Sequence, residues 1–109
     1  MLKPPDQHRP AFPQDDVPLT SVLTELKQMA EQGDVEAQYL LGALYTHEEG
    51  IPQDYKDAIP QDYQEAVRWF RLAAEQGHVE SQYFLGGMYK DGEGVPQNYQ
   101  KALRWWSLA

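Results

Sequence analysis

Three features are scarce or missing in this chain of 109 residues, and each absence excludes a class of function. There is no cysteine, which excludes disulfides, thiolate metal ligands and cysteine nucleophiles. Basic residues are few, nine against 17 acidic ones, so the formal charge of −8 opposes nucleic-acid binding, which needs concentrated cations. No apolar run approaches the roughly 20 residues of a membrane-spanning helix, so no membrane partner is expected. A soluble domain with a basic or neutral protein partner fits this composition best.

The first 18 residues differ in composition from the rest. They contain five prolines and little periodic hydrophobicity, so residues 1–18 are predicted to form a proline-rich arm that is extended or disordered. The segment has no apolar stretch of the kind found in secretion signals. We expect a cytoplasmic protein, or a periplasmic one if a signal precedes this sequence.

The remaining residues, 19–109, repeat themselves. The segment from Ala30 to Tyr45 returns 44 residues later, from Ala74 to Tyr89, with 11 of 16 positions identical. Units that cannot bury their apolar faces alone stack on their neighbours and form broad, open surfaces. This organisation favours binding over catalysis, and the sequence predicts no catalytic residue, metal site or cofactor.

Apolar residues recur at steps of three and four along five segments, which are predicted to be helices. The predicted helices run over about 19–32, 35–45, 61–76, 79–89 and 97–108. We therefore divide the domain into a cap helix of about 19–32, a first repeat of about 34–76 and a second of about 78–109. Asp34 is a good capping residue for the second helix, whereas His78 at the matching position is a poorer one.

The first repeat contains a small tandem duplication. The octapeptide from Ile51 to Ala58 is followed at once by a second copy from Ile59 to Ala66, with six of eight positions identical. Because proline disfavours helix at the residues before it, Pro60 should prevent the two copies from fusing into one helix. We expect residues 51–66 to form a bulging loop with about one helical turn near residues 54–57.

Both repeats carry one set of residue types at matched spacing. In the first, the set is Ala37, Gln38, Tyr39, Leu41, Gly42, Tyr45, Gly50, Pro52, Asp62, Tyr63, Ala66, Trp69, Ala73, Ala74 and Gly77. In the second, it is Ser81, Gln82, Tyr83, Leu85, Gly86, Tyr89, Gly92, Gly94, Val95, Pro96, Gln97, Asn98, Tyr99, Ala102 and Trp105. The set resembles the Sel1-like repeat family, a relative of the tetratricopeptide repeats. This resemblance implies an all-α fold, a right-handed α/α superhelix of antiparallel helix pairs, used mainly as an adaptor in protein complexes.

Two positions depart from the family pattern. Glu48 stands where the pattern has the glycine matched by Gly92, so the first connection is expected to differ from the second. Glu25 stands where Trp69 and Trp105 stand in the later helices. A charged residue there is typical of an end helix that faces water, so the first helix is interpreted as an N-terminal cap.

A partner-binding face is predicted from apolar positions that the family pattern leaves free. Leu40 and Phe84 are such positions, and an apolar residue follows each of them one helical turn later. On a concave face these pairs would anchor a partner protein or peptide, with glutamines in a polar rim. The alternative is that they pack against the adjacent helix, because a wide apolar stripe is normal in buried helices. The predicted partner-binding residues are Leu40, Leu44, Phe84, Met88, Gln38 and Gln82.

Two other functions stay open at this stage. Trp105, Trp106 and Leu108 are followed by no polar capping helix in this sequence, so they could pack on another copy of the chain and make a homo-oligomer. An enzyme is the less favoured reading, since the serines sit in no nucleophile motif.

Overall fold

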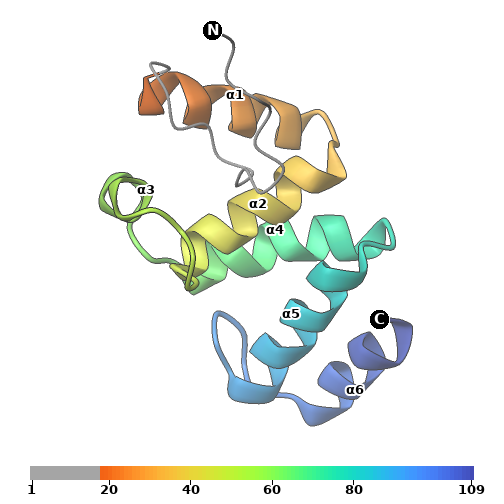
Figure 1. The fold of residues 1–109 in the computed structure, drawn as a ribbon. Coiled ribbons are helices and arrows are strands. Elements are labelled where there is room, and N and C mark those ends of the chain that lie inside the picture. Colours follow the sequence, from red (N-terminus) through yellow and green to blue (C-terminus); the bar gives the residue numbers. More distant parts are fainter. Residues whose placement is uncertain (1–17) are drawn as a thin grey trace, which may run out of the picture.

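The structure, a computed structural model, describes residues 18–109, and within this range the chain is helical with no strand (Figure 1). The helices are α1 (Leu19–Glu31), α2 (Val35–Thr46), α3 (Gln53–Ala58), α4 (Tyr63–Glu75), α5 (Val79–Asp91) and α6 (Tyr99–Leu108). Five of them correspond to the predicted helices, and α3 is the helical turn predicted in the duplicated loop. The predicted arm, apart from Pro18, lies outside the described residues.

The helices stack in chain order. Helix α2 packs between α1 and α4, α4 packs on α5, and α5 packs on α6. Consecutive long helices run back and forth, and α3 projects from the side of the stack (Figure 1). This is the all-α superhelix of antiparallel helix pairs that the sequence predicts. No helix within residues 18–109 is both long and apolar enough to cross a membrane.

Two buried clusters hold the stack together. One joins α1, α2, α3 and α4 and includes Leu41, Tyr55 and Trp69. The other joins α2, α4, α5 and α6 and includes Phe70, Leu85 and Met88. Because each cluster lies between successive layers, stability depends on contacts between neighbouring helices rather than on one central core.

Two glycines allow the helices to approach closely. A Cβ atom added at Gly42 would lie 2.6 Å from Cδ1 of Phe70, and one added at Gly86 would collide with the indole of Trp106. Each glycine therefore receives an aromatic ring from the following helix of the same repeat. Since even a methyl group has no room there, both positions favour glycine despite its low helix propensity.

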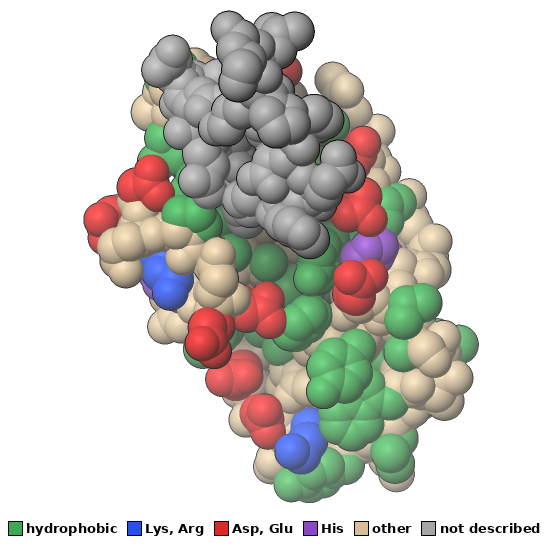
Figure 2. All heavy atoms as spheres, viewed as in Figure 1, with side chains coloured by type: hydrophobic (Ala, Val, Ile, Leu, Met, Phe, Trp, Pro, Cys, Tyr) green, Lys and Arg blue, Asp and Glu red, His purple; other side chains and the backbone are tan. Residues whose placement is uncertain are grey.

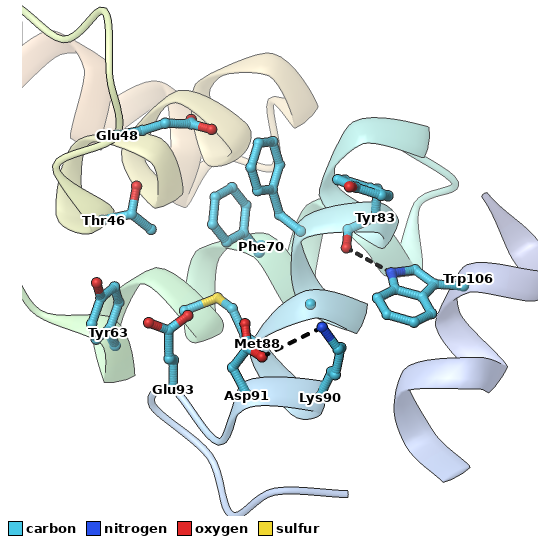
Figure 3. A pocket seen from close by; sticks show the side chains of 12 residues that line it. Thr46, Glu48, Tyr63, Phe70, Tyr83, Met88, Lys90, Asp91, Glu93 and Trp106 are labelled. Atoms are coloured by element: carbon cyan, nitrogen blue, oxygen red, sulfur yellow. Dashed lines mark hydrogen bonds and ion pairs between the residues drawn. The ribbon is translucent and has the colours of Figure 1, made fainter. Parts of the chain in front are cut away.

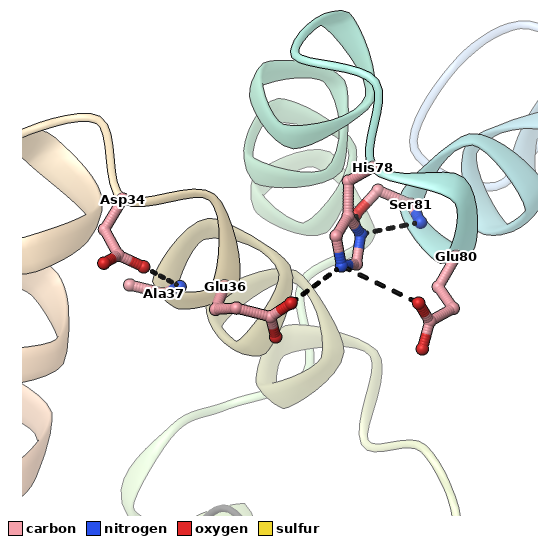
Figure 4. A network of polar contacts seen from close by, with 6 residues as sticks. All are labelled: Asp34, Glu36, Ala37, His78, Glu80 and Ser81. Carbon is pink, nitrogen blue, oxygen red and sulfur yellow. Dashed lines mark hydrogen bonds and ion pairs between the residues drawn. The ribbon is translucent and has the colours of Figure 1, made fainter.

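Side chains cap the first turns of α2, α4, α5 and α6. Asp34 accepts a hydrogen bond from the Ala37 amide at 2.9 Å, as predicted. His78 also caps its helix, since its Nδ1 atom accepts from the Ser81 amide at 3.2 Å, a longer bond than that of Asp34 (Figure 4). An accepting Nδ1 places the ring proton on Nε2. This proton points to Glu36 of α2, whose Oε1 atom lies 3.2 Å away.

The two connections between paired helices begin differently. Helix α5 ends at Gly92, which has the left-handed φ of 70°. Helix α2 ends one position earlier, and the left-handed residue is His47 with φ of 56°. Glu48, at the position that matches Gly92, therefore does not adopt the left-handed conformation, which costs energy in residues other than glycine. The first connection is unlike the second, as predicted.

The same connections nevertheless close with the same hydrogen bonds. The Asp62 amide donates to the Tyr45 carbonyl at 2.9 Å, and the Asn98 amide donates to the Tyr89 carbonyl at 2.8 Å. A glutamine side chain adds a second bond in each repeat, from Gln61 to the Thr46 carbonyl at 3.0 Å and from Gln97 to the Lys90 carbonyl at 2.9 Å. The additional octapeptide is therefore accommodated between two fixed ends.

Candidate protein-binding groove

The described part of the chain has an open groove over α5, with a volume of about 380 Å³ (Figure 3). Its apolar floor includes Phe70 of α4 and Phe84 and Met88 of α5, and Trp106 of α6 closes one side. Glu48, in the chain that follows α2, reaches the opposite side. The groove thus lies at the junction of the two repeats, where layers from both contribute side chains.

Only part of the predicted partner-binding set lines this groove. Phe84 is half-buried and stacks on Phe70, with ring centroids 5.4 Å apart and planes at 10°. Met88 is buried and forms the floor beside it. Leu40 and Leu44 instead pack in the cluster between α1 and α2, where Leu44 is only 1% exposed. For these two leucines, packing against the adjacent helix describes the structure better than an exposed anchor surface.

The predicted polar rim of glutamines is corrected by the structure. Gln38 and Gln82 are buried, and each donates from Nε2 to the carbonyl of the alanine that lies in the last two residues of the preceding helix, Ala30 or Ala74. Both bonds are 3.1 Å long. Helix ends leave carbonyl groups without partners within the helix, so these glutamines act as caps between layers rather than as a rim for a ligand.

Carboxylates surround the mouth of the groove. Glu48, Asp91 and Glu93 line it together with a single cation, Lys90. Burial raises the pKa of Glu48 above the ordinary glutamate value, because removing water disfavours its charged form. The pKa of Tyr39 is also raised, first by burial and then by the negative charges of Glu48 and two further glutamates. The groove is therefore apolar at its floor and negative at its mouth (Figure 2).

Metal binding has no support in the described residues. Within 18–109, no group of three histidine, aspartate or glutamate side chains is placed to hold a metal ion. His47, which begins the His-Glu-Glu run of the first connection, is engaged with the Ile59 carbonyl through Nε2. Its contact stabilises the loop.

A family model for the Sel1 repeat matches this chain twice, over residues 35–78 and 79–109. The chain belongs to the Sel1 repeat family. Proteins of this family generally serve as modules for protein–protein interaction. The groove spans the two Sel1 repeats, since Glu48 and Phe70 belong to the first and Phe84 and Trp106 belong to the second.

Solved structures of similar chains agree with this assignment. A Sel1 repeat protein from Oxalobacter formigenes is 31% identical with a TM-score of 0.71, and the match covers 84% of this chain and 24% of that one. A protective antigen present in uropathogenic Escherichia coli strains, which displays an SLR fold, is 36% identical with a TM-score of 0.71. That match covers 84% of this chain and 18% of the antigen. The Sel1 repeats described here thus span about a quarter or less of either protein. A search of curated proteins found no match.

Among the residues that line the groove, only Phe84 and Met88 belong to the partner-binding set predicted from the sequence. Gly87 lies on the groove side of α5, and a Cβ atom added there would meet nothing within 4 Å. Trp106 was assigned to a self-association surface, but its indole Nε1 donates to the Tyr83 carbonyl at 3.0 Å within the chain. The one available signal was the run of two glycines at 86 and 87, which is unusual inside a helix and indicates a packing or functional requirement.

Proposed function

We propose that this chain is a protein–protein interaction module that binds a segment of a partner protein in the groove over α5. The observation that carries the proposal is the open apolar floor of Phe84 and Met88 at the repeat junction, with Tyr83 still 61% exposed at its edge. Concave apolar sites with a few polar groups at the rim are typical binding sites. The proposed role is non-catalytic.

Filling the groove tests this function without damaging the scaffold. Gly87→Phe places a ring on the groove side of α5, while Gly87→Ala leaves the groove open. Both changes raise helix propensity, alanine more than phenylalanine. Both variants should fold at least as stably as the native chain. A partner captured from lysate by the native chain and by Gly87→Ala, and then titrated as purified protein, should lose binding to Gly87→Phe.

Equal affinity of the captured partner for all three baits would show that the partner binds elsewhere. Substitutions at Leu40 and Phe84 are poorer probes of this face. Both side chains pack against buried clusters, so replacing them with serine would also lower the stability of the fold.

Self-association is a second candidate, and exposed side chains on α6 favour it. Leu103 is 64% exposed, whereas Val67 at the matching position of α4 is 4% exposed because α5 covers it. In addition, Oε1 of buried Gln82 has no hydrogen-bond partner among residues 18–109, while that of Gln38 accepts from Gln76. Another helix layer docked on α6 would cover Leu103 and approach Oε1 of Gln82.

Sedimentation over a range of concentrations tests self-association. The native chain should increase in mass as concentration rises, and Leu103→Glu should abolish the increase because it buries a charge at the new contact. A native chain that stays monomeric at all concentrations would exclude this candidate.

A further inference from the structure

The charges at the mouth of the groove are unevenly matched. Lys90 lies 3.8 Å from Asp91, so the single cation is shared with one of the three carboxylates. Glu48 and Glu93 form no ion pair with any residue in the described range, and both line the groove (Figure 3). A ligand with a positive charge would therefore meet two carboxylates that no described cation neutralises.

Glu48 has a physical reason to accept such a ligand. Its carboxylate is partly desolvated, and burial makes its charged form less stable. A partly buried charge without a counter-charge is unfavourable, and a cation that enters the groove removes this penalty. An acidic or neutral segment that entered the groove would not remove this penalty, so the groove favours a positively charged ligand.

The negative field extends beyond the groove itself. Glu36 and Glu80 add to Glu48 in raising the pKa of Tyr39, whose ring lies 6.3 Å from that of Phe84. Carboxylates border the apolar hollow on both sides in the space-filling view (Figure 2). This distribution also attracts a basic segment before contact, because the net charge of the chain is negative.

The aromatic floor distinguishes between the two common cations. Phe84 stacks on Phe70, and the ring of Tyr83 meets Phe84 edge-on at 5.8 Å with planes at 74°. Flat π surfaces favour a planar guanidinium over a compact, strongly hydrated ammonium. The chain itself shows this contact elsewhere, where the guanidinium of Arg68 lies 4.7 Å from the Trp69 ring centre.

Building on the proposed function, we propose that the groove binds an arginine of a partner segment, with its guanidinium over Phe84 and within reach of Glu48 and Glu93. An apolar residue next to that arginine packs on Met88. The ligand class is therefore a basic peptide segment with arginine beside an apolar residue, presented by another protein.

Selection from a displayed peptide library tests the inference on the full chain. Peptides are selected on the native chain and counter-selected on Gly87→Phe, so that only binders that need the open groove remain. These binders should be enriched in arginine beside an apolar residue. In one selected peptide, replacing the arginine with citrulline, its neutral isostere, should weaken binding at least about tenfold, and lysine should bind less well than arginine.

Substitution on the protein side tests which carboxylates matter. Glu48→Gln should weaken binding of the arginine peptide, though by less than the citrulline change because Glu93 remains. It should leave binding of the citrulline peptide unchanged, because that peptide has no positive charge for Glu48 to meet. Glu31→Gln, at the exposed end of α1, makes the same change of net charge and should leave binding unchanged within about twofold. Helical circular dichroism of the variants confirms that they are folded.

The outcomes separate this inference from the proposed function. Groove-dependent peptides that lack arginine or tolerate citrulline would overturn the arginine inference and leave the binding function standing. If every peptide that binds the native chain also binds Gly87→Phe as tightly, so that counter-selection leaves no binder, both proposals are overturned. If instead the chain dimerises and the dimer excludes the peptide, a second copy occupies the groove and the arginine inference fails.

Discussion

The two octapeptides at 51–58 and 59–66 share six of eight residues, yet they adopt different structures. In the first copy, Asp54 lies in the first turn of α3, and its side chain accepts from the next amide, that of Tyr55, at 3.1 Å. In the second copy, Asp62 is extended and accepts from the amides of Gln64 and Glu65 as the cap of α4. One local sequence therefore begins a helix at Gln53 in the first copy and two positions later, at Tyr63, in the second.

Tertiary contacts decide between these two states. The second copy is continuous with α4, whose apolar side packs on α2, so its Gln61 and Asp62 reach the end of that helix. The first copy is one octapeptide too far from α4 to make the same bonds, and it forms a short helix whose Tyr55 is buried against α1 and α2. Local preference limits the choices, and packing selects among them.

Deletion of either copy should have the largest effect on the stability of the fold. Removal of residues 51–58 or of residues 59–66 gives nearly the same shortened chain, with a first connection equal in length to the second. Both variants should fold alike and lose about 3 kcal/mol of unfolding free energy, because Tyr55 and one isoleucine lose their buried places. Urea denaturation followed by circular dichroism measures this loss. A deletion that folds while its counterpart does not would show that the copies are not equivalent.

Alanine at the two close-packed glycines compares the repeats themselves. Gly42→Ala should cost about 2 kcal/mol after the gain in helix propensity, because Phe70 is fully buried and cannot move away from the new methyl group. Gly86→Ala should cost less, since Trp106 is half-exposed on the last helix and can shift. The control is Gly87→Ala, which meets no neighbour and should stabilise the fold by up to about 1 kcal/mol. Equal urea midpoints for the first two variants would contradict this asymmetry.

Removing the aspartate of each octapeptide sharpens the comparison of their roles. Asp62→Ala should lower the unfolding free energy by about 1 kcal/mol, because two amides at the start of α4 lose their acceptor. Asp54→Ala should change it by less than about 0.5 kcal/mol, as is usual for surface positions. Asn substituted at 62 retains the acceptor and should be close to neutral. The prediction fails if both alanine variants melt at the same temperature.

Exchanging the cap of the second repeat for that of the first gives the smallest expected effect. Aspartate is the better intrinsic cap, but at position 78 it would face Glu36 and Glu80, which lie 3.2 and 3.8 Å from the histidine ring nitrogen. His78→Asp should therefore shift the unfolding free energy by no more than about 0.5 kcal/mol at low salt. Its stability relative to the native chain should rise with added salt, because salt screens the repulsion. A gain that is independent of salt would exclude this explanation.

Much of the fold could be predicted because its signals are local. Apolar periodicity located the long helices, and Asp34 marked the start of α2. The contact of the His78 ring with Glu36 was not predictable, because it depends on which ring nitrogen carries the proton and on a residue in another layer. Caps from ionisable rings require the three-dimensional surroundings.

The site was only partly predictable for a similar reason. Gln38 and Gln82 are polar and were expected at a rim, yet the approach of the preceding helix buries them against its final carbonyls. Leu44 and Met88 occupy matched positions, but only Met88 reaches the groove. Which member of a matched pair becomes part of a site depends on how the layers rotate along the superhelix, and that rotation leaves no local trace in the sequence.

In each repeat, a glutamine caps the end of the preceding helix. This feature has a consequence for how arrays of Sel1 repeats change in evolution. Gln38 caps the end of α1, and Gln82 caps the end of α4. Each repeat thus supplies the glutamine that caps the helix before it. The end of its own second helix carries the carbonyl group that the next repeat's glutamine caps. A gene segment that encodes one repeat and is copied in frame would encode both the capping glutamine and the helix end that a following glutamine caps. Arrays of this kind can therefore lengthen or shorten by whole units without inventing a new interface.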